Sequence, residues 1–368
     1  MGKDCLERAD IALRRLCGNG LLAPFGDPLE CVRGLVGIQS QSQQFAELSI
    51  RNRCPAGLST ADLSAHYRAH EIVNVWGQRH TLHMYVRDDW DAVCDIYRHR
   101  SWGKKYHELF PEAFDELLER VQREMREGGA ILKSALSALV DDRVGALLTE
   151  DDYFEYAFIR FCCVDGIFFG QPDKPSIKVF VPYHRVRAEK WQPDEARAAR
   201  ALENVMLRYF AHYGPATILD FRHWSGLSAG ETKATFARIE NLLSSVACDG
   251  RTYYTHGEAP ASDVPQDRLF LLGKFDPLFV SYAHKDWIAT EAQAKAVWRS
   301  AARVEAVVLE GARILGTWRH EMKGRKLSLN VAPLGKIGVR SRKKIEARAE
   351  ELASFWDRML DRVTYLPE

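Results

Sequence analysis

The 368-residue chain lacks the short patterns that mark most cofactor, nucleotide and metal sites. It contains no G-x-G-x-x-G and no G-x-x-x-x-G-K-[ST], so the sequence supports neither a Rossmann nor a P-loop nucleotide site. His66 and His70 share one face of an expected helix, but no H-E-x-x-H or C-x-x-C completes a ligand set around them. We therefore expect no cofactor and no metal.

Long apolar runs and disulfide spacings are also missing. No stretch reaches the roughly 18 consecutive apolar residues of a membrane-spanning helix, and the first residues include acids in place of an apolar signal segment. The eight cysteines show no spacing typical of disulfides. These features predict a reduced, cytoplasmic protein without a membrane partner.

The chain has almost no net charge, but the charge is unevenly placed. Lys and Arg number 51 against 50 for Asp and Glu, so bulk charge does not indicate a nucleic-acid binder. Residues 313–348 nevertheless hold eleven basic and two acidic residues, 11 − 2 = +9, whereas residues 108–127 give 3 − 7 = −4. A local basic surface near the C-terminus is what phosphate binding needs.

Helices followed by a pair of short strands recur three times along the chain. The first copy is expected to have helices at 6–16, 28–36 and 59–67 and strands at 72–76 and 81–86. The second has helices at 132–140 and 153–164 and strands at 166–170 and 176–182. The third has helices at 201–210, 217–224 and 228–243 and a hairpin turned at 249–250. This pattern is typical of winged-helix domains.

Beyond residue 268 the pattern changes to short strands with glycine turns, followed by a terminal helix. Strands are expected at 270–272, 279–280, 307–309, 314–318 and 327–331, and the helix at 343–360. We therefore predict an α+β protein with tandem winged-helix domains and a small β-barrel. The predicted domains are 1–105, 106–195, 196–262 and 263–368, the last being the barrel with the C-terminal helix.

The polar segment 37–44 contains two glutamines, Gln39 and Gln41, directly after a well-capped helix. Its plainest interpretation is a solvated helix end. On a continuing helix these residues would point to different sides, so they converge only where the helix ends or the backbone bends. Each carboxamide offers one acceptor and two donors, enough to orient a water molecule. A G-x-S-x-G match around Ser228 is better explained as a helix N-cap than as a nucleophile.

Five segments in order resemble the AlkZ-like winged-helix DNA glycosylases, in particular the bacterial Gln-x-Gln subgroup. They are Ile38-Gln39-Ser40-Gln41, Trp76-Gly77-Gln78-Arg79-His80-Thr81-Leu82-His83, Tyr213-Gly214-Pro215 with Trp224-Ser225-Gly226, Leu272-Gly273-Lys274-Phe275-Asp276-Pro277, and Gly316-Thr317-Trp318-Arg319. The resemblance covers nearly the whole chain. The residue between the two glutamines is commonly apolar in this family, whereas here it is Ser40.

The resemblance implies a C-shaped array of winged helices around a small barrel, with DNA along the concave side and the glutamines at its centre. It implies hydrolysis of the N-glycosidic bond of alkylated purines, chiefly N7-alkylguanine, in double-stranded DNA by a monomeric enzyme. The family includes enzymes that unhook interstrand crosslinks and that protect makers of DNA-alkylating natural products. Gln39 and Gln41 would be the catalytic residues. No amine nucleophile is obvious beside them, so the product would be an intact abasic site.

Two further groups of residues are candidate DNA contacts. Arg79 and His80 lie in the loop between the first pair of expected strands, and Thr81 and His83 follow on one face of the second strand. Lys323, Arg325 and Lys326 lie in an expected turn between late strands, where the alternative is simply an exposed charged turn. His83 either faces the lesion or is a hydrogen-bonded structural histidine.

Two other functions remain open on the sequence alone. Winged helices more often serve non-catalytic transcriptional regulators than glycosylases, and a protein-interaction scaffold comes third. A regulator has no need of the glutamine pair but would need a region for ligand binding or dimerisation. The pair therefore favours the enzyme.

Overall fold

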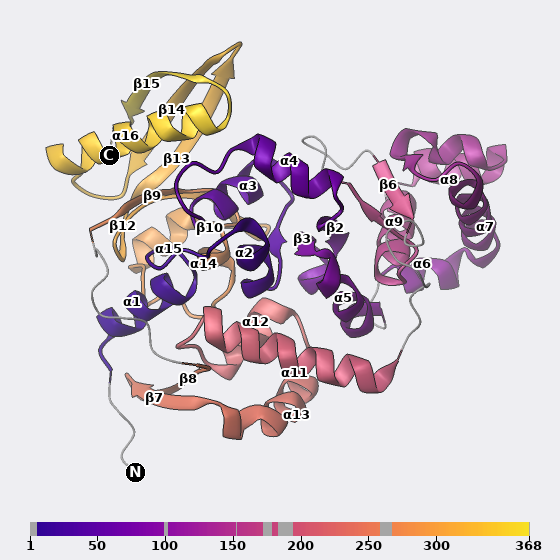
Figure 1. Ribbon diagram of the computed structural model, residues 1–368, viewed down its shortest axis with the longest axis horizontal. Coiled ribbons are helices and arrows are strands. Elements are labelled where there is room, and N and C mark those ends of the chain that lie inside the picture. Colours follow the sequence, from indigo (N-terminus) through magenta and orange to yellow (C-terminus); the bar gives the residue numbers. More distant parts are fainter. Residues whose placement is uncertain are drawn as a thin grey trace. The chain divides into compact units, whose positions relative to one another are not determined.

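The computed structural model describes residues 6–98, 102–151, 153–171, 179–182, 194–257 and 267–367 (Figure 1). The chain divides into two compact units, each with helices and strands. Unit 1 comprises Met1–Ile38, Gln44–Leu63 and Val205–Glu368, and unit 2 comprises Gln39–Gln43 and Ser64–Asn204. The predicted α+β class is confirmed. In the described ranges no helix is both long and apolar enough to cross a membrane.

Unit 1 holds helices with clear sequence signals together with three that the sequence analysis did not predict, at 43–51, 277–280 and 291–297. They are α1 (Arg8–Gly18), α2 (Pro28–Gly34), α3 (Gln43–Arg51), the start of α4 (Thr60–Arg68), the end of α11 (Glu195–His212), α12 (Ile218–Ser225), α13 (Ala229–Ile239), α14 (Pro277–Val280), α15 (Glu291–Val297) and α16 (Val339–Phe355). The side chain of Asp27 accepts the Glu30 N–H at 2.8 Å, as expected of an N-cap. Ser228 caps α13 in the same way, which confirms its structural role.

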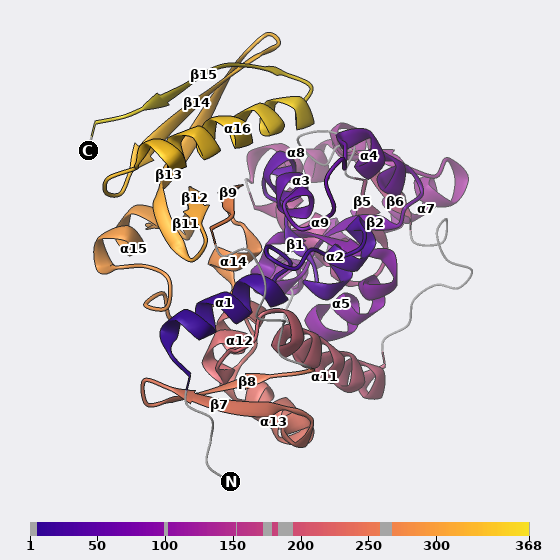
Figure 2. The ribbon, with the colours of Figure 1, turned by 60° about the vertical axis from the view of Figure 1, so that its left-hand side comes forward.

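The C-terminal part of unit 1 forms an open five-stranded sheet in the order β15-β14-β13-β12-β9 (Figure 2). Its strands are β9 (Leu269–Leu272), β12 (Ala306–Glu310), β13 (Arg313–Lys323), β14 (Lys326–Pro333) and β15 (Met359–Tyr365). The last strand pairs with β14 in parallel, and the other pairs are antiparallel. The prediction of a small closed barrel is wrong, because β9 and β15 are the two edges of the described sheet.

Two local predictions in this region are also wrong. Residues 279–280 belong to α14 and not to a strand, because Asp276 accepts the Leu278 N–H and Pro277 occupies the first helical turn. The terminal helix ends at Phe355, and the left-handed backbone of Asp357 (φ 51°) leads the chain into β15. Two small hairpins complete the strands of unit 1. They are β7 (Ser244–Cys248) with β8 (Arg251–Thr255), and β10 (Trp298–Arg299) with β11 (Arg303–Val304).

Unit 2 is built on a six-stranded sheet in the order β1-β3-β2-β5-β6-β4. Its strands are β1 (Ile38–Gln39), β2 (Ile72–Trp76), β3 (Leu82–Val86), β4 (Ile131–Leu132), β5 (Phe168–Gly170) and β6 (Val179–Pro182). Two predicted hairpins form, β2 with β3 and β5 with β6, and a pairing of Asn74 with Gly170 joins them into one sheet. The tandem winged-helix arrangement and the four domain boundaries stay predictions.

The helices of unit 2 carry weaker sequence signals, and most of them were not predicted. They are α5 (Trp90–Tyr97), α6 (Trp102–Leu109), α7 (Pro111–Glu127), α8 (Asp142–Glu150) and α9 (Phe154–Val164). Only α9 matches an expected helix. The segment predicted as a helix at 132–140 is instead strand β4 followed by a 3-10 helix, Lys133–Leu139. The strand residue Ile131 pairs with Phe180 of β6, a contact that local sequence does not encode.

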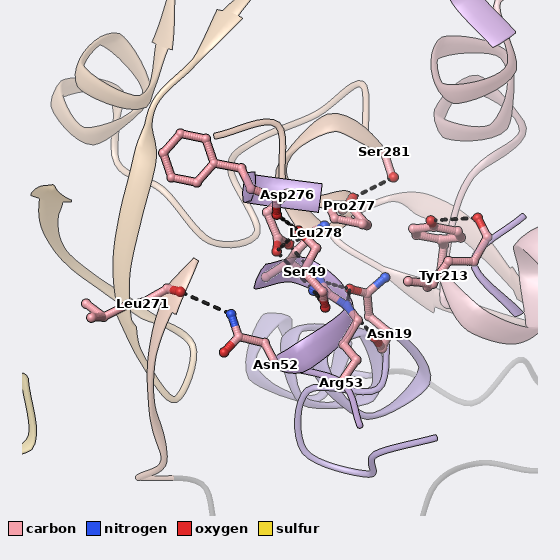
Figure 3. Close-up of polar contacts among 12 residues, drawn as sticks. Asn19, Ser49, Asn52, Arg53, Tyr213, Leu271, Asp276, Pro277, Leu278 and Ser281 are labelled. Carbon is pink, nitrogen blue, oxygen red and sulfur yellow. Dashed lines mark hydrogen bonds and ion pairs between the residues drawn. The ribbon is translucent and has the colours of Figure 1, made fainter. Parts of the chain in front are cut away.

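A buried ion pair fixes the centre of unit 1 (Figure 3). Arg53 and Asp276 are both fully buried, with Arg53 Nη2 2.6 Å from Asp276 Oδ1 and Nη1 2.9 Å from Oδ2. Arg53 also donates to the Asn19 carbonyl, and Ser49 donates to the Asp276 carboxylate at 3.1 Å. Each charge is therefore compensated by a charged partner and by hydrogen bonds. Asp276 belongs to one of the five resemblance segments, and its role there is structural.

Other resemblance segments of unit 1 are also structural. Trp318 is buried and its indole N–H donates to the Leu272 carbonyl at 2.9 Å. A side chain on Gly316 would place its Cβ only 2.5 Å from the Ala332 carbonyl oxygen, so the close approach of β13 to β14 requires glycine there. The Tyr213 hydroxyl donates to the Leu35 carbonyl at 3.0 Å. These residues hold the fold of unit 1 together.

Candidate active site

The two glutamines lie where the backbone passes from a strand to a helix. Gln39 ends β1, and the Ser40 N–H donates to the Leu82 carbonyl of β3 at 2.8 Å. Gln41 lies in the bend that precedes α3. The backbone between Gln39 and Gln41 is therefore not helical. This agrees with the expectation that the two side chains can converge only where a helix ends or the backbone bends. Both residues belong to unit 2.

Gln39 is bound by an arginine from the neighbouring hairpin. Arg79 Nη2 donates to Gln39 Oε1 at 2.8 Å. A guanidinium group has no acceptor, so the carboxamide oxygen must face Arg79 and the NH₂ group must face away. Arg79 and His80 both adopt left-handed backbone angles, with φ of 51° and 59°. Such angles are uncommon outside glycine, so the structure holds this loop in a strained conformation beside Gln39.

The serine between the two glutamines has a specific partner. The Ser40 hydroxyl donates to Asn74 Oδ1 at 2.6 Å, and both side chains are buried. Asn74 lies in β2, so this bond ties the glutamine loop to the sheet. A polar residue at a commonly apolar position is therefore compensated here by a buried amide.

A cavity of about 210 Å³ opens beside this loop. Its lining consists of polar groups from the loop, aromatic rings and a few aliphatic side chains: Ser40, Gln41, Gln43, Asn74, Trp76, Leu82, Lys133, Tyr156, Ile159 and Phe180. Trp76 Nε1 donates to the Tyr156 hydroxyl at 3.2 Å, and the two rings meet edge to face with centroids 5.8 Å apart. Gln41 thus lies at the cavity, whereas Gln39 lies against Arg79.

Comparison with known proteins decides the family. A family model described as "DNA glycosylase AlkZ-like" matches residues 32–355, most of the chain. The chain belongs to this family. A curated relative from Streptomyces sahachiroi, named "Interstrand DNA cross-link repair glycosylase", is 26% identical over 314 residues, which cover 78% of this chain and 81% of the relative. The prediction of a DNA glycosylase is confirmed.

A solved structure shares the fold of this AlkZ-like chain. The structure of the Streptomyces sahachiroi DNA glycosylase AlkZ superposes with a TM-score of 0.77 at 21% identity. The match covers 98% of this chain and 99% of the solved chain. The two proteins therefore have the same architecture over almost their whole length.

One predicted site residue of the AlkZ-like chain, His83, lies on the far side of the β2–β3 hairpin from the cavity. Asn74, Trp76 and Leu82 line the cavity, and the alternation along β3 places His83 on the opposite face. Only 1% of His83 is exposed, and its Nδ1 lies 3.0 Å from the Thr81 carbonyl. Burial, with the nearby charge of Arg79, lowers the pKa of His83 to about 3. His83 is therefore neutral, which favours its structural alternative.

The basic residues predicted at a late turn lie at the tip of the β13–β14 hairpin in unit 1. Lys323 ends β13 and Lys326 begins β14, so the predicted turn is confirmed. The side chains of Arg325 and Lys326 are exposed. Arg325 lies 3.3 Å from Asp357, and Lys326 lies 3.1 Å from Asp361. These charges are accessible but partly compensated.

The structure adds residues that the sequence analysis of this AlkZ-like chain missed. Lys133 lines the same cavity as Gln41, and the sequence analysis did not identify this amine. Its ammonium forms an ion pair with Glu155, with Nζ 2.7 Å from Oε2. Tyr156 comes from α9, far along the chain, and no local motif marked it. Of the aromatic residues Trp76 and Tyr156, Trp76 could have been found from the sequence, because it begins one of the segments that resemble the family.

Proposed function

We propose that this chain is a monofunctional DNA glycosylase that hydrolyses the N-glycosidic bond of alkylated purines, chiefly N7-alkylguanine, in double-stranded DNA. Gln39 and Gln41 are the proposed catalytic residues. The observation that carries this proposal is that residues 39–41 and 76–83, from two of the segments that resemble the family, lie side by side in unit 2. Arg79 of one segment binds Gln39 of the other, and Gln41 lies at a cavity lined in part by Trp76.

The chemistry of the substrate explains why two amides suffice. An N7-alkylated guanine already carries a positive charge, so it leaves as a neutral base without protonation by the enzyme. The remaining requirements are a positioned water molecule and dipoles that stabilise an oxocarbenium-like sugar. A carboxamide can do both through its carbonyl oxygen, although less strongly than a carboxylate. Undamaged purines, which need acid assistance, would then be poor substrates.

The contacts of the two glutamines suggest a division of labour. Gln41 is exposed at the cavity, so its amide is accessible to a water molecule and to the sugar. The carbonyl oxygen of Gln39 already accepts from Arg79, and Gln39 is only 9% exposed. We assign Gln41 to direct positioning of the water. Gln39 contributes its carbonyl dipole once a DNA phosphate draws Arg79 away.

DNA binding is assigned to two surfaces. Arg79, His80 and Thr81 form the first, next to the glutamine loop, and Nδ1 of buried His83 lies 3.0 Å from the Thr81 carbonyl. Lys323, Arg325 and Lys326 form the second, at the exposed hairpin tip. Positive groups at such positions contact phosphates irrespective of base sequence. We propose that the enzyme acts as a monomer with tandem winged-helix domains.

The relative named as a cross-link repair glycosylase extends the range of substrates to test. Interstrand crosslinks and natural-product adducts at guanine N7 have the same cationic leaving group as N7-methylguanine. An enzyme with this chemistry would serve in repair or in self-resistance. The space available around Gln41 determines whether this chain accepts such bulky lesions.

The decisive experiment is base release from a duplex that carries a single N7-methylguanine. We expect the purified protein to release the base and to leave an abasic strand that breaks only on alkali treatment. A matched uracil duplex should remain intact. Binding of the alkylated duplex without release of any base would favour the non-catalytic regulator.

The product also tests the role of Lys133. Borohydride should trap no covalent complex with the wild-type protein, because the Lys133 ammonium is held by Glu155. A trapped complex that disappears in Lys133→Ala would instead show a Schiff-base lyase and would overturn the monofunctional assignment.

A further inference from the structure

Three arginine side chains line one small cavity in unit 1. Arg51 ends α3, Arg268 directly precedes β9, and Arg348 lies on α16. All three are partly buried, and the exposed residues 55–57 of the loop after α3 complete this side of the lining. The cavity has a volume of about 60 Å³, far below the roughly 300–1,000 Å³ of pockets for drug-sized ligands. It therefore has room for one small group.

Positive charge exceeds negative charge around this cavity. Among the described lining residues the one carboxylate is Glu351, whose Oε2 lies 2.5 Å from Arg348 Nη1 and 3.9 Å from Arg51 Nη1. Arg268 forms no ion pair with any carboxylate of the described ranges, and its guanidinium lies over the Phe270 ring, 5.2 Å from the centroid. Three positive charges and one negative charge give 3 − 1 = +2 over these residues.

The cluster also leaves donor capacity unused. The Nε atom of Arg51 is buried and has no hydrogen-bond partner among the described residues. Burial lowers the pKa of Arg51 and of Arg268, and the positive charge of Arg348 lowers both further, with Glu351 offsetting only part of the effect. Like charges held close together in a partly buried place oppose folding, and such local conflicts are expected at functional sites. The cavity therefore favours an anion.

A phosphate group matches this cavity in charge, size and donor geometry. A guanidinium presents its N–H groups in a planar fork that fits two phosphate oxygens, and a phosphate is small enough for the space. The fold holds two of the arginines in position. Arg348 Nε donates to the Leu269 carbonyl at 3.1 Å, and the Arg51 guanidinium lies over the Phe355 ring, 5.1 Å from its centroid. These donors are therefore positioned by unit 1 itself.

We propose that Arg51, Arg268 and Arg348 bind one phosphate of a DNA strand and form a third DNA-contact surface of this chain. None of the three is among the site residues predicted from the sequence, although Arg348 belongs to the basic stretch 313–348. The inference rests on DNA as the substrate of the proposed function, but not on the chemistry of base release. A contact to the strand backbone carries no information on base sequence, so it serves damaged and undamaged DNA alike.

The affinity for an undamaged duplex at several salt concentrations tests the contact without requiring base release. Arg268→Gln removes a side chain that makes no hydrogen bond or ion pair with the described residues, so the melting temperature should not fall. We expect the slope of log affinity against log salt to fall by about one. The matched control is Arg340→Gln on α16, where an exposed arginine is already paired with Asp267 at 3.3 Å. It should keep the wild-type slope, and a wild-type slope in Arg268→Gln would overturn the proposal.

A variant that conserves the charge separates a phosphate contact from disturbance of the fold. Arg268→Lys keeps the positive charge but loses the planar fork. It should therefore keep the wild-type salt slope and bind the duplex more weakly than the wild type does. A slope reduced as far as in Arg268→Gln would show that the loss does not follow the charge, and it would overturn the proposal.

Inorganic phosphate distinguishes a DNA contact from a site for a free anion. At constant ionic strength the wild-type protein should broaden the ³¹P NMR line of inorganic phosphate, Arg268→Gln should broaden it less, and an undamaged duplex should reverse the broadening. Broadening that the duplex does not reverse would assign the cavity to free phosphate and overturn the DNA contact.

Base release remains a separate measurement from this contact. Release of N7-methylguanine together with an unchanged salt slope in Arg268→Gln would refute the contact and leave the glycosylase function intact. A reduced slope in Arg268→Gln, without release of any base by the wild type, would support the contact and refute the function.

Discussion

The Arg53–Asp276 network of unit 1 and the glutamine loop of unit 2 are both built from segments that resemble the same family, but their interactions differ in kind. In unit 1, two full charges are completely buried, and each is compensated by its charged partner and by further hydrogen bonds. In unit 2, the neutral amide of Gln39 accepts a hydrogen bond from Arg79, and Gln41 is exposed at a cavity. A family signature in a sequence can therefore mark either the fold or the chemistry.

The two kinds of interaction suit different roles. A buried ion pair is stable only if nothing disturbs its geometry, so it suits a scaffold. Amides that keep an accessible donor or acceptor retain the capacity to bind a substrate. Four predictions test this contrast, from the largest expected effect to the smallest.

Removal of the buried carboxylate should destabilise the fold most. Asp276→Ala leaves the Arg53 charge buried without its partner, so the free energy of unfolding should fall by about 3–5 kcal/mol. The control is Asp267→Ala, which removes an exposed carboxylate paired with Lys344 and should change the stability far less, because an exposed ion pair contributes little. Chemical denaturation measures both. A similar loss in the two variants would contradict a scaffold role specific to Asp276.

Removal of the exposed amide should instead abolish chemistry and spare the fold. Gln41→Ala should lower single-turnover base release by about 10²–10³ and leave the melting temperature and DNA affinity nearly unchanged, because the amide acts on the transition state. Gln39→Ala should also lower release. Gln44→Ala, a nearby glutamine outside the cavity lining, is the control. Wild-type activity of a Gln39→Ala, Gln41→Ala double variant would refute the assignment.

The buried histidine of unit 2 predicts a pH dependence of stability. His83 has a pKa of about 3 when folded and about 6.5 when unfolded, so between these values the unfolded chain binds the additional proton. Its contribution to stability is fully present above pH 6.5 and is lost as the pH falls toward 3. The slope should reach about 1.4 kcal/mol per pH unit. His83→Gln should flatten the curve of unfolding free energy against pH between 4 and 6.5; an unchanged curve would show that His83 is already protonated when folded.

Charge neutralisation should separate DNA binding from base release. Lys323→Gln, Arg325→Gln and Lys326→Gln should each reduce the slope of log affinity against log salt by about one, and base release at saturating protein should not change. Arg79→Gln should reduce the same slope and also change base release, because Arg79 binds Gln39. Lys295→Gln, at an exposed ion pair on α15, serves as control. Salt slopes equal to the wild type would show that the hairpin charges are only solvated.

Local signals in the sequence were sufficient for part of this structure. The caps at Asp27 and Ser228 and the hairpin that holds Arg79 depend on residues within a few positions, and all three form as predicted. The prediction of a closed barrel was wrong because closure depends on which strands pair across the sheet. Strand β15 was not predicted, because its first residues fell within a helix that was expected to run to residue 360. Pairings between distant segments are not encoded in local periodicity.

The site shows the same limit. Gln39 and Gln41 were found because a motif names them, and Trp76 stands in a second motif. Tyr156 and Lys133 reach the cavity from other elements, so only the three-dimensional arrangement brings them to Gln41. The sequence left two roles for His83, because the alternation of side chains along a strand defines two faces but does not show which face contacts the ligand.

The absence of an ionisable group on the glutamine loop itself has a consequence for the cell that holds this enzyme. On the proposed mechanism, Gln39 and Gln41 cannot supply the proton that a normal purine needs in order to leave. Intact bases vastly outnumber lesions in a chromosome, so a glycosylase with a strong acid would become mutagenic if overproduced. Because a carboxamide loop does not release undamaged purines, a high concentration of the enzyme would not damage intact DNA. A cell under heavy alkylation can therefore accumulate such a protein.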